Sequence, residues 1–142
     1  MKIRFWGVRG SVPSPGPSTA KIGGNTSCVE IRLDNNIFIV DCGTGLRELG
    51  LALTKELPVK ARIFFSHVHW DHIQGFPFFA PAYIPGNEFQ LYGLKNSKHS
   101  LQSVLEKQMS GPNFPVGFNV MNAKFIFTEI SAGEIINIDD LK

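Results

Sequence analysis

Apolar and polar side chains alternate along the first two-fifths of the chain in the two-residue period of a β-strand. Residues 1–8 show this pattern, and residues 27–33 repeat it before a turn signal at 34–36 and a second apolar run at 37–40. This arrangement predicts one strand followed by a β-hairpin. Residues 9–26 are rich in Gly, Pro and Ser, so they predict a long surface loop without regular structure, of the kind that often carries function.

The apolar positions take helical spacing twice farther along the chain. Residues 45–56 predict a helix that Pro58 ends, and residues 101–109 predict a second helix with Ser100 as its N-cap. A short apolar strand at 61–65 follows the first helix. Strand, helix and strand in this order indicate an α/β layer, so the predicted fold class is α/β (α+β).

The remaining segments add two short elements and a terminal strand pair. Residues 66–72 predict a polar loop, and residues 73–83, rich in Phe, predict a short buried helix interrupted by its prolines. Residues 89–92 predict another short strand. Residues 124–130 and 134–138 have the composition of two strands joined by a turn.

The composition is that of one folded domain and excludes several classes of protein. Hydrophobic residues make up 43% of the 142 residues and charged residues 18%, so a core can form and disorder is excluded. A net charge of +2 does not fit a polycationic nucleic-acid clamp or a membrane-surface binder. No apolar run is long enough to cross a membrane, and residues 1–8 lack the apolar centre of a secretory signal. We therefore expect a cytoplasmic protein without a membrane partner.

The two cysteines, Cys28 and Cys42, indicate a reducing compartment. They do not form a Cys-x-x-Cys pair and are too few for a disulfide framework. We expect two buried free thiols, and the alternatives are a stray pair or contact with a metal.

Three of the four histidines lie within residues 67–72, together with one carboxylate. Residues two apart in an extended segment point the same way, so His67 and His69 can reach one metal ion. Asp71 and His72 follow after the chain turns and can reach a second ion. Imidazole and carboxylate together suit Zn²⁺ best, with Mn²⁺ or Fe²⁺ as alternatives. The competing interpretation is a polar surface loop or histidines with satisfied hydrogen bonds.

The segment 66–72, Ser-His-Val-His-Trp-Asp-His, resembles the signature H-x-H-x-D-H loop of the metallo-β-lactamase superfamily. Residues 37–45 resemble the strand and Asp-Gly motif that precede the first helix of that family. Residues 5–13 and 24–28 are similar to the branch that contains ribonuclease Z and cyclic-nucleotide phosphodiesterases. The resemblance implies an αββα sandwich, of which residues 1–142 form the N-terminal part: the first βα half, with a mixed sheet and helices on one face.

The resemblance also implies a hydrolase in which two metal ions activate a hydroxide, acting on a small-molecule or nucleotide phosphodiester. His67, His69, Asp71 and His72 would be metal ligands, and Asp71 would also handle the proton of the attacking water. Asp41 would accept a hydrogen bond from the loop and orient its ligands, although a helix cap or a turn also explains this residue.

Three further residues receive weaker assignments. Ser66 is expected to cap the backbone of the metal loop, because no general base accompanies it as a nucleophile would require. Arg9 and Asn25 would line a phosphate-binding lip, and the alternative is an ordinary solvated loop. Residues 114–118 are expected either to form a hydrophobic lip over the site or to pack in the core.

The main departure from the family pattern lies in the missing ligands of the second half. The family site needs a further histidine, a bridging aspartate and a last histidine, whereas His99 is the one histidine after residue 72 and is interpreted as a surface residue. Asp139 and Asp140 are weak candidates for the bridging carboxylate. We therefore expect a chain truncated before the second half, with either a missing C-terminal half or a second copy covering an exposed apolar sheet face.

Two alternatives to a phosphodiesterase follow. One is a thioester or lactone hydrolase on the same scaffold, since a fold does not determine a substrate. The other is an inactive fragment that needs a second half to complete its site.

Overall fold

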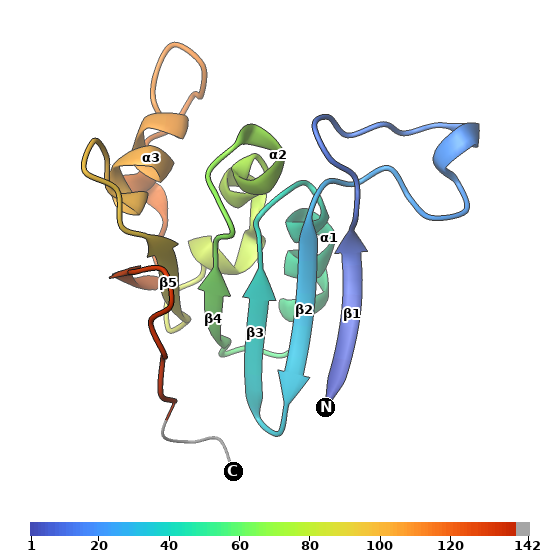
Figure 1. Cartoon of the computed structure of the whole chain (residues 1–142). Coiled ribbons are helices and arrows are strands. Elements are labelled where there is room, and N and C mark those ends of the chain that lie inside the picture. Colours follow the sequence, from blue (N-terminus) through green and yellow to red (C-terminus); the bar gives the residue numbers. More distant parts are fainter. Residues whose placement is uncertain (139–142) are drawn as a thin grey trace.

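A computed structural model of the chain describes residues 1–138 and shows one six-stranded mixed sheet (Figure 1). The strands lie in sequence order, with β1, β2 and β3 antiparallel and β3 to β6 parallel. Their bounds are Lys2–Gly7 for β1, Cys28–Leu33 for β2, Asn36–Val40 for β3, Lys60–Phe64 for β4, Glu88–Leu94 for β5 and Lys124–Ile130 for β6. The mixed α/β class predicted from the sequence is confirmed.

Helices make the crossovers that parallel strands require. Helix α1 (Gly45–Leu53) connects β3 to β4, α2 (Trp70–Ile73) begins the connection to β5, and α3 (Leu101–Gln108) begins the connection to β6. Short 3-10 turns complete these connections and the first loop: η1 (Pro17–Thr19), η2 (Phe76–Phe78), η3 (Ala80–Tyr83) and η4 (Phe118–Val120). The side chain of Ser100 caps α3, as the sequence predicts, by accepting a hydrogen bond from the backbone N–H of Ser103.

The core lies between the sheet and the helices on one face. Ile39, Ile63 and Leu91 come from three neighbouring parallel strands and pack with Leu49 of α1 and Leu105 of α3, and all five are fully buried. Helices on one face of a mixed sheet are therefore as predicted. Each buried aliphatic side chain of this kind contributes roughly 1.5–3 kcal/mol.

No helix of the described residues covers the opposite face of the sheet (Figure 1). The strand register places Phe5, Phe64 and Tyr92 on this face, and the rings of Phe64 and Tyr92 stack with centroids 4.6 Å apart. Arg62 and Gln90 stand in the next register row of the same face. The face is thus apolar at one end and polar toward the other, and its coverage by a second copy or another segment stays a prediction.

The structure corrects four expectations. Residues 134–138 form no strand, because β6 is the last strand of the described sheet and Ile135 points into solvent, 82% exposed. The polar loop at 66–72 ends early, because α2 begins at Trp70. Residues 73–83 contain the end of α2 and two 3-10 turns instead of one helix, since proline lacks the N–H that an α-helix needs. The first long loop contains η1.

Cys28 and Cys42 are buried free thiols, as predicted. Burial is the main cause that raises the pKa of both thiols, so they are neutral core groups. The longest helix of residues 1–138, α1, has nine residues, and a membrane span needs about twenty, so none of the described helices can cross a membrane.

Candidate metal centre

The candidate site lies where two parallel strands end side by side. Asp41 directly follows β3, and Ser66 lies two residues after the end of β4. The backbone N–H of Asp41 donates to the carbonyl of Phe64 across the two strands (2.9 Å). The carboxyl ends of parallel strands are where open α/β sheets place their ligand sites. The loop that carries the histidines leaves the sheet at this point.

A buried carboxylate supports the loop from below. Asp41 is 4% exposed and accepts hydrogen bonds from the hydroxyl of Ser27 (3.0 Å) and from the backbone N–H (2.9 Å) and hydroxyl (2.8 Å) of Ser66. Its backbone has a φ of 64°, a left-handed conformation that Asp tolerates better than most residues. Asp41 is not the cap of α1, because Thr44 occupies that position. The side chain therefore serves the metal loop, with Ser27 as a partner that the sequence does not reveal.

The same carboxylate orients one imidazole. The Nδ1 atom of His72 lies 2.8 Å from Oδ2 of Asp41, so the Nδ1–H tautomer donates this hydrogen bond. Its Nε2 atom is then left with a lone pair and lies 3.4 Å from Oδ2 of Asp71. A histidine held by a carboxylate through one nitrogen is the usual arrangement for a metal ligand.

Three side chains converge to form a possible ligand set. His67, Asp71 and His72 each offer a ligand atom, and these atoms lie within 4.8 Å of one another. The rings of His67 and His72 have centroids 4.0 Å apart. Two imidazoles and one carboxylate form a donor set that fits Zn²⁺. The residues present therefore fit a transition-metal ion.

His69 lies beside this set and not within it. Its ring meets that of His67 edge-on, with centroids 4.5 Å apart. The chain turns directly after His69, which is the N-cap residue of α2, and this turn brings Asp71 and His72 back toward His67. The sequence predicts one pair from His67 and His69 and another from Asp71 and His72, whereas the structure places His67 at the junction of both pairs.

Asp71 is fixed by a contact from the long N-terminal loop. The backbone N–H of Ser11 donates to Oδ2 of Asp71 (2.7 Å). This hydrogen bond is the main cause that lowers the pKa of Asp71, and the neighbouring His72 and His67 lower it further. A carboxylate of low pKa holds a cation better than it accepts a proton, so the environment of Asp71 suits a ligand more than a general base. Nothing in the Gly-rich sequence indicates which amide of the loop makes this contact.

Glycines allow the metal loop to pack tightly against the turn after β3. A Cβ on Gly75 would lie 2.0 Å from the carbonyl oxygen of Gly43, and one on Gly43 would lie 2.3 Å from the carbonyl oxygen of Asp71. Backbone hydrogen bonds join the same segments, from Cys42 to His72 (2.7 Å) and from Gly75 to Cys42 (2.8 Å). Direct contact between the two backbones therefore positions α2 over Asp41.

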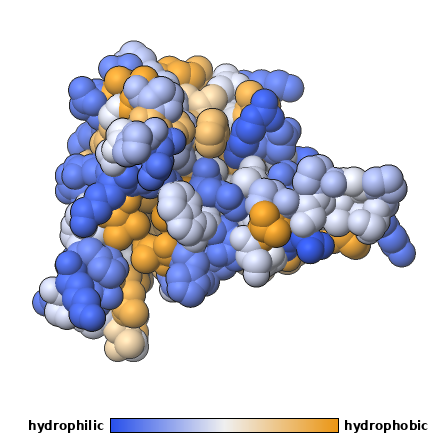
Figure 2. Space-filling model, turned by 90° about the horizontal axis from the view of Figure 1, so that it is seen from above, coloured by the Kyte–Doolittle hydropathy of each residue, from blue (hydrophilic) through white to orange (hydrophobic). Residues whose placement is uncertain are grey.

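The predicted phosphate lip lies at the root of a projecting arm formed by residues 9–26, which extends to one side of the molecule (Figures 1 and 2). The carbonyl of Asn25 accepts hydrogen bonds from the N–H groups of Val8 and Arg9 (3.1 and 3.0 Å). Its side-chain oxygen accepts one from Thr44 (3.1 Å). The hydrogen bond to Thr44 joins the arm to the start of α1. Arg9, in contrast, is exposed. A phosphate-binding role for either residue stays a prediction.

Of the three remaining histidine and carboxylate candidates, the structure places His99. His99, interpreted as a surface residue, is half-buried and lines a hollow of about 120 Å³ together with His67. Asp139 and Asp140 lie outside the described residues. Phe114 and Phe118 both pack against the core, as one of the two expectations has it, and Phe114 also lines a neighbouring hollow.

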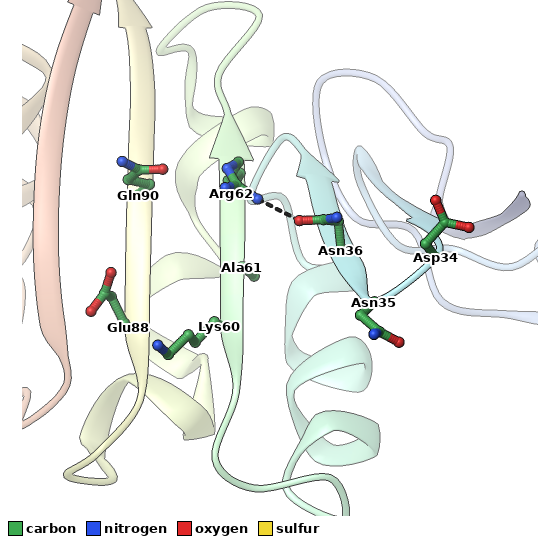
Figure 3. Close-up of a pocket in the computed structure, with 8 residues that line it drawn as sticks. All are labelled: Asp34, Asn35, Asn36, Lys60, Ala61, Arg62, Glu88 and Gln90. Carbon is green, nitrogen blue, oxygen red and sulfur yellow. Dashed lines mark hydrogen bonds between the residues drawn. The ribbon is translucent and has the colours of Figure 1, made fainter. Parts of the chain in front are cut away.

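A polar hollow of about 400 Å³ lies at the opposite end of the sheet (Figure 3). Lys60, Arg62 and Glu88 are among the residues that line it, and the guanidinium of Arg62 donates to the side-chain oxygen of Asn36 (2.7 Å). None of the predicted site residues among residues 1–138 lines it.

Comparison with known proteins supports the fold. Residues 22–88 match the metallo-β-lactamase superfamily. A protein of Prochlorococcus marinus strain MIT 9515 named ribonuclease Z is 29% identical over 136 residues, covering 92% of this chain and 41% of that protein. The chain therefore spans about two-fifths of the length of this relative.

Two solved structures share the fold. Human tRNase Z, short form, superposes with a TM-score of 0.58 at 22% identity over 91% of this chain and 45% of that chain. A metallo-β-lactamase-fold protein of Bacillus subtilis superposes with a TM-score of 0.60 at 16% identity over 96% of this chain and 48% of that chain. With the H-x-H-x-D-H loop placed directly after β4, the chain has the metallo-β-lactamase fold, and the segment that matches the superfamily includes this loop.

Proposed function

We propose that the protein is a metal-dependent hydrolase that acts on phosphodiester bonds. The observation that carries the proposal is the convergence of His67, Asp71 and His72 within 4.8 Å above the buried carboxylate of Asp41. The relative from Prochlorococcus is named ribonuclease Z, and a ribonuclease cleaves a phosphodiester bond. That name supports the phosphodiester over a thioester or a lactone as the substrate bond.

The residues of this chain divide into ligands and supports. His67, His69, Asp71 and His72 would hold the metal, and Zn²⁺ bound there would polarise the phosphoryl oxygen and lower the pKa of water. Asp41 keeps Nε2 of His72 free of a proton by accepting the Nδ1–H.

Two further hydrogen bonds hold the metal-binding loop and its carboxylate in place. Ser11 holds Asp71 in place, and Ser66 links Asp41 to the loop. These contacts supply a preformed arrangement, which saves the ordering cost that a flexible site would incur on binding.

The proposal assigns residues 1–142 to the N-terminal part of one domain, with the rest of a two-metal site supplied by a further segment. The chain covers 41% of the Prochlorococcus relative and 45% of the human structure, and this length difference supports the assignment. Until that segment is present, we expect the four residues to bind metal more weakly than a complete site.

Metal analysis and turnover test the proposal together. The purified chain is dialysed against Zn²⁺ or Mn²⁺, its metal content is measured, and it is offered bis(p-nitrophenyl) phosphate, a thioester and a lactone. We expect bound zinc that is lost in His72→Ala, and hydrolysis of the diester alone among the three. Bound zinc without turnover of any substrate supports the need for a completing segment. Thioester or lactone turnover without diester turnover contradicts the phosphodiester assignment.

A further inference from the structure

Trp70 is an exposed aromatic residue inside the metal-binding loop. It stands between His69 and Asp71 and is 63% exposed, although its indole ring is largely apolar. The Trp70 side chain lines two hollows, one of about 320 Å³ and one of about 400 Å³. Seen from this end of the molecule, apolar surface is interspersed with polar surface (Figure 2). A large aromatic ring between two cavities offers both of its faces to a flat ligand.

The two hollows differ in chemistry. Pro77, Phe78 and Phe114 give the smaller hollow an apolar wall, and one cation, Arg47, also lines it. Lys98 and Lys107 give the larger hollow a positive rim. An aromatic ring flanked by an apolar cavity and a cationic cavity matches a ligand that joins a flat ring to a negatively charged group.

Gln108 and Asn113 line both hollows, and one of their polar atoms is unpaired. The side-chain amide of Gln108 donates to the carbonyl of Ile73 (3.1 Å). Its Oε1 atom is buried and finds no hydrogen-bond donor within residues 1–138. The hydrogen bond to Ile73 holds the Gln108 side chain against α2, where it lines both hollows.

The cationic hollow continues toward the metal centre. Val68 and His99 line it and also line the hollow of about 120 Å³ that His67 and Ser66 border. Trp70 lines this cationic hollow but not the smaller one that His67 borders. A ligand on Trp70 therefore lies beside the reacting group and not on it.

We propose that Trp70 and its two hollows form a nucleobase-binding site for the nucleotide next to the scissile phosphodiester. The base stacks on the indole ring, and Lys98 and Lys107 bind the adjoining phosphate. This inference rests on the proposed function, because it assigns the nucleoside portion of the substrate of the same site. Stacking of this kind tolerates any base, because every base has a flat aromatic face.

Binding without catalysis tests the inference. The probe is a fluorescein-labelled hexaadenylate, titrated with the chain in EDTA so that neither metal nor hydrolysis contributes, and binding is followed by anisotropy. We expect Trp70→Ala to weaken binding roughly tenfold, Trp70→Phe to restore most of the affinity, and Lys98→Ala with Lys107→Ala to weaken binding and reduce its salt dependence. Unlabelled adenosine 5′-monophosphate should compete, whereas ribose 5-phosphate, which lacks the base, should not.

Matched variants away from these hollows provide the controls. Phe5 is 66% exposed on β1, and Lys60 lies at the opposite end of the sheet, so Phe5→Ala and Lys60→Ala should leave the affinity unchanged. Equal losses for Trp70→Ala and Phe5→Ala, or equal competition by both sugar phosphates, would overturn the nucleobase assignment. Neither result would affect zinc binding or diester turnover, so the two proposals fail separately.

Discussion

The two ends of the same parallel strands carry hollows of similar size and different chemistry. At the carboxyl end, a hollow of about 400 Å³ borders the loop of His67–His72. At the opposite end, another hollow of about 400 Å³ is lined by Lys60, Arg62 and Glu88 (Figure 3). Volume therefore does not distinguish a candidate site from an ordinary surface depression in this molecule.

The arrangement of the polar groups distinguishes the two ends. At the opposite end, cations and acceptors pair with each other on the surface, as Lys124 does with Glu88 (3.1 Å) and Arg62 with Asn36 (2.7 Å). At the carboxyl end, one buried carboxylate fixes an imidazole whose second nitrogen faces another carboxylate. Buried groups that orient unpaired ligand atoms are the mark of a prepared site, whereas exposed pairs contribute little.

The largest expected difference between the two ends is in the stability lost when a glycine is replaced by alanine. Gly75→Ala places a Cβ 2.0 Å from the carbonyl of Gly43, so we expect the free energy of unfolding to fall by about 3 kcal/mol, measured by urea denaturation. Gly86, near the opposite end, has open space around it and a φ of 89°, so Gly86→Ala should cost about 1 kcal/mol through backbone strain alone. Equal losses would show that the close backbone contact at the metal loop is not needed.

Zinc should stabilise the carboxyl end alone. A ligand that binds only the folded state at about 100 times its Kd adds about 2.7 kcal/mol to the free energy of unfolding, which raises the Tm. We expect this rise in a thermal melt of the chain with Zn²⁺, its abolition by His72→Ala, and its persistence in Glu88→Gln at the other end. A rise that His72→Ala leaves unchanged would place the bound zinc elsewhere.

The buried carboxylate should matter for metal affinity more than a matched exposed one. Asp41 and Asp34 both have left-handed backbone, with φ of 64° and 52°, but only Asp41 is buried beneath the loop. Asp41→Asn removes the acceptor of His72, so we expect zinc affinity measured by calorimetry to fall roughly 10–100-fold. Asp34→Asn should leave it unchanged, since Asn tolerates the same backbone. A loss in both variants would indicate a general effect of net charge.

Much of the fold and the motif can be predicted from the sequence because both depend on local patterns. Period-two alternation locates β1 and β2, and the spacing of three histidines and Asp71 identifies the loop. The contacts that complete the site join distant residues, such as Ser11 to Asp71 and Ser27 to Asp41. No local pattern encodes them, because they depend on how the arm and β2 pack against the loop.

The wrong prediction of a strand at 134–138 has a related cause. Its alternating residues suit a strand, but a strand also needs a partner, and β6 is the last strand in residues 1–138. The grouping of His67 with both Asp71 and His72 likewise depends on the start of α2 at Trp70, which the polar character of the loop hides. Local propensity thus identifies the candidate residues, and tertiary packing determines how they group.

The smallest expected effect is a pH dependence away from the metal loop. Arg32 forms a two-pronged hydrogen bond to Glu56 (2.6 and 3.0 Å), and this contact lowers the pKa of Glu56. A carboxyl group whose pKa falls on folding stabilises the protein above its unfolded pKa, and this stability is lost as the pH falls through the folded value. Because both side chains are partly exposed, solvent screening limits the contribution to about 0.5 kcal/mol. Glu56→Gln should therefore lower the free energy of unfolding slightly at pH 7, and this deficit should shrink as the pH falls through the lowered pKa of Glu56 in the folded protein. A deficit that persists at low pH would mean that the Glu56 side chain stabilises the fold by packing and not by charge.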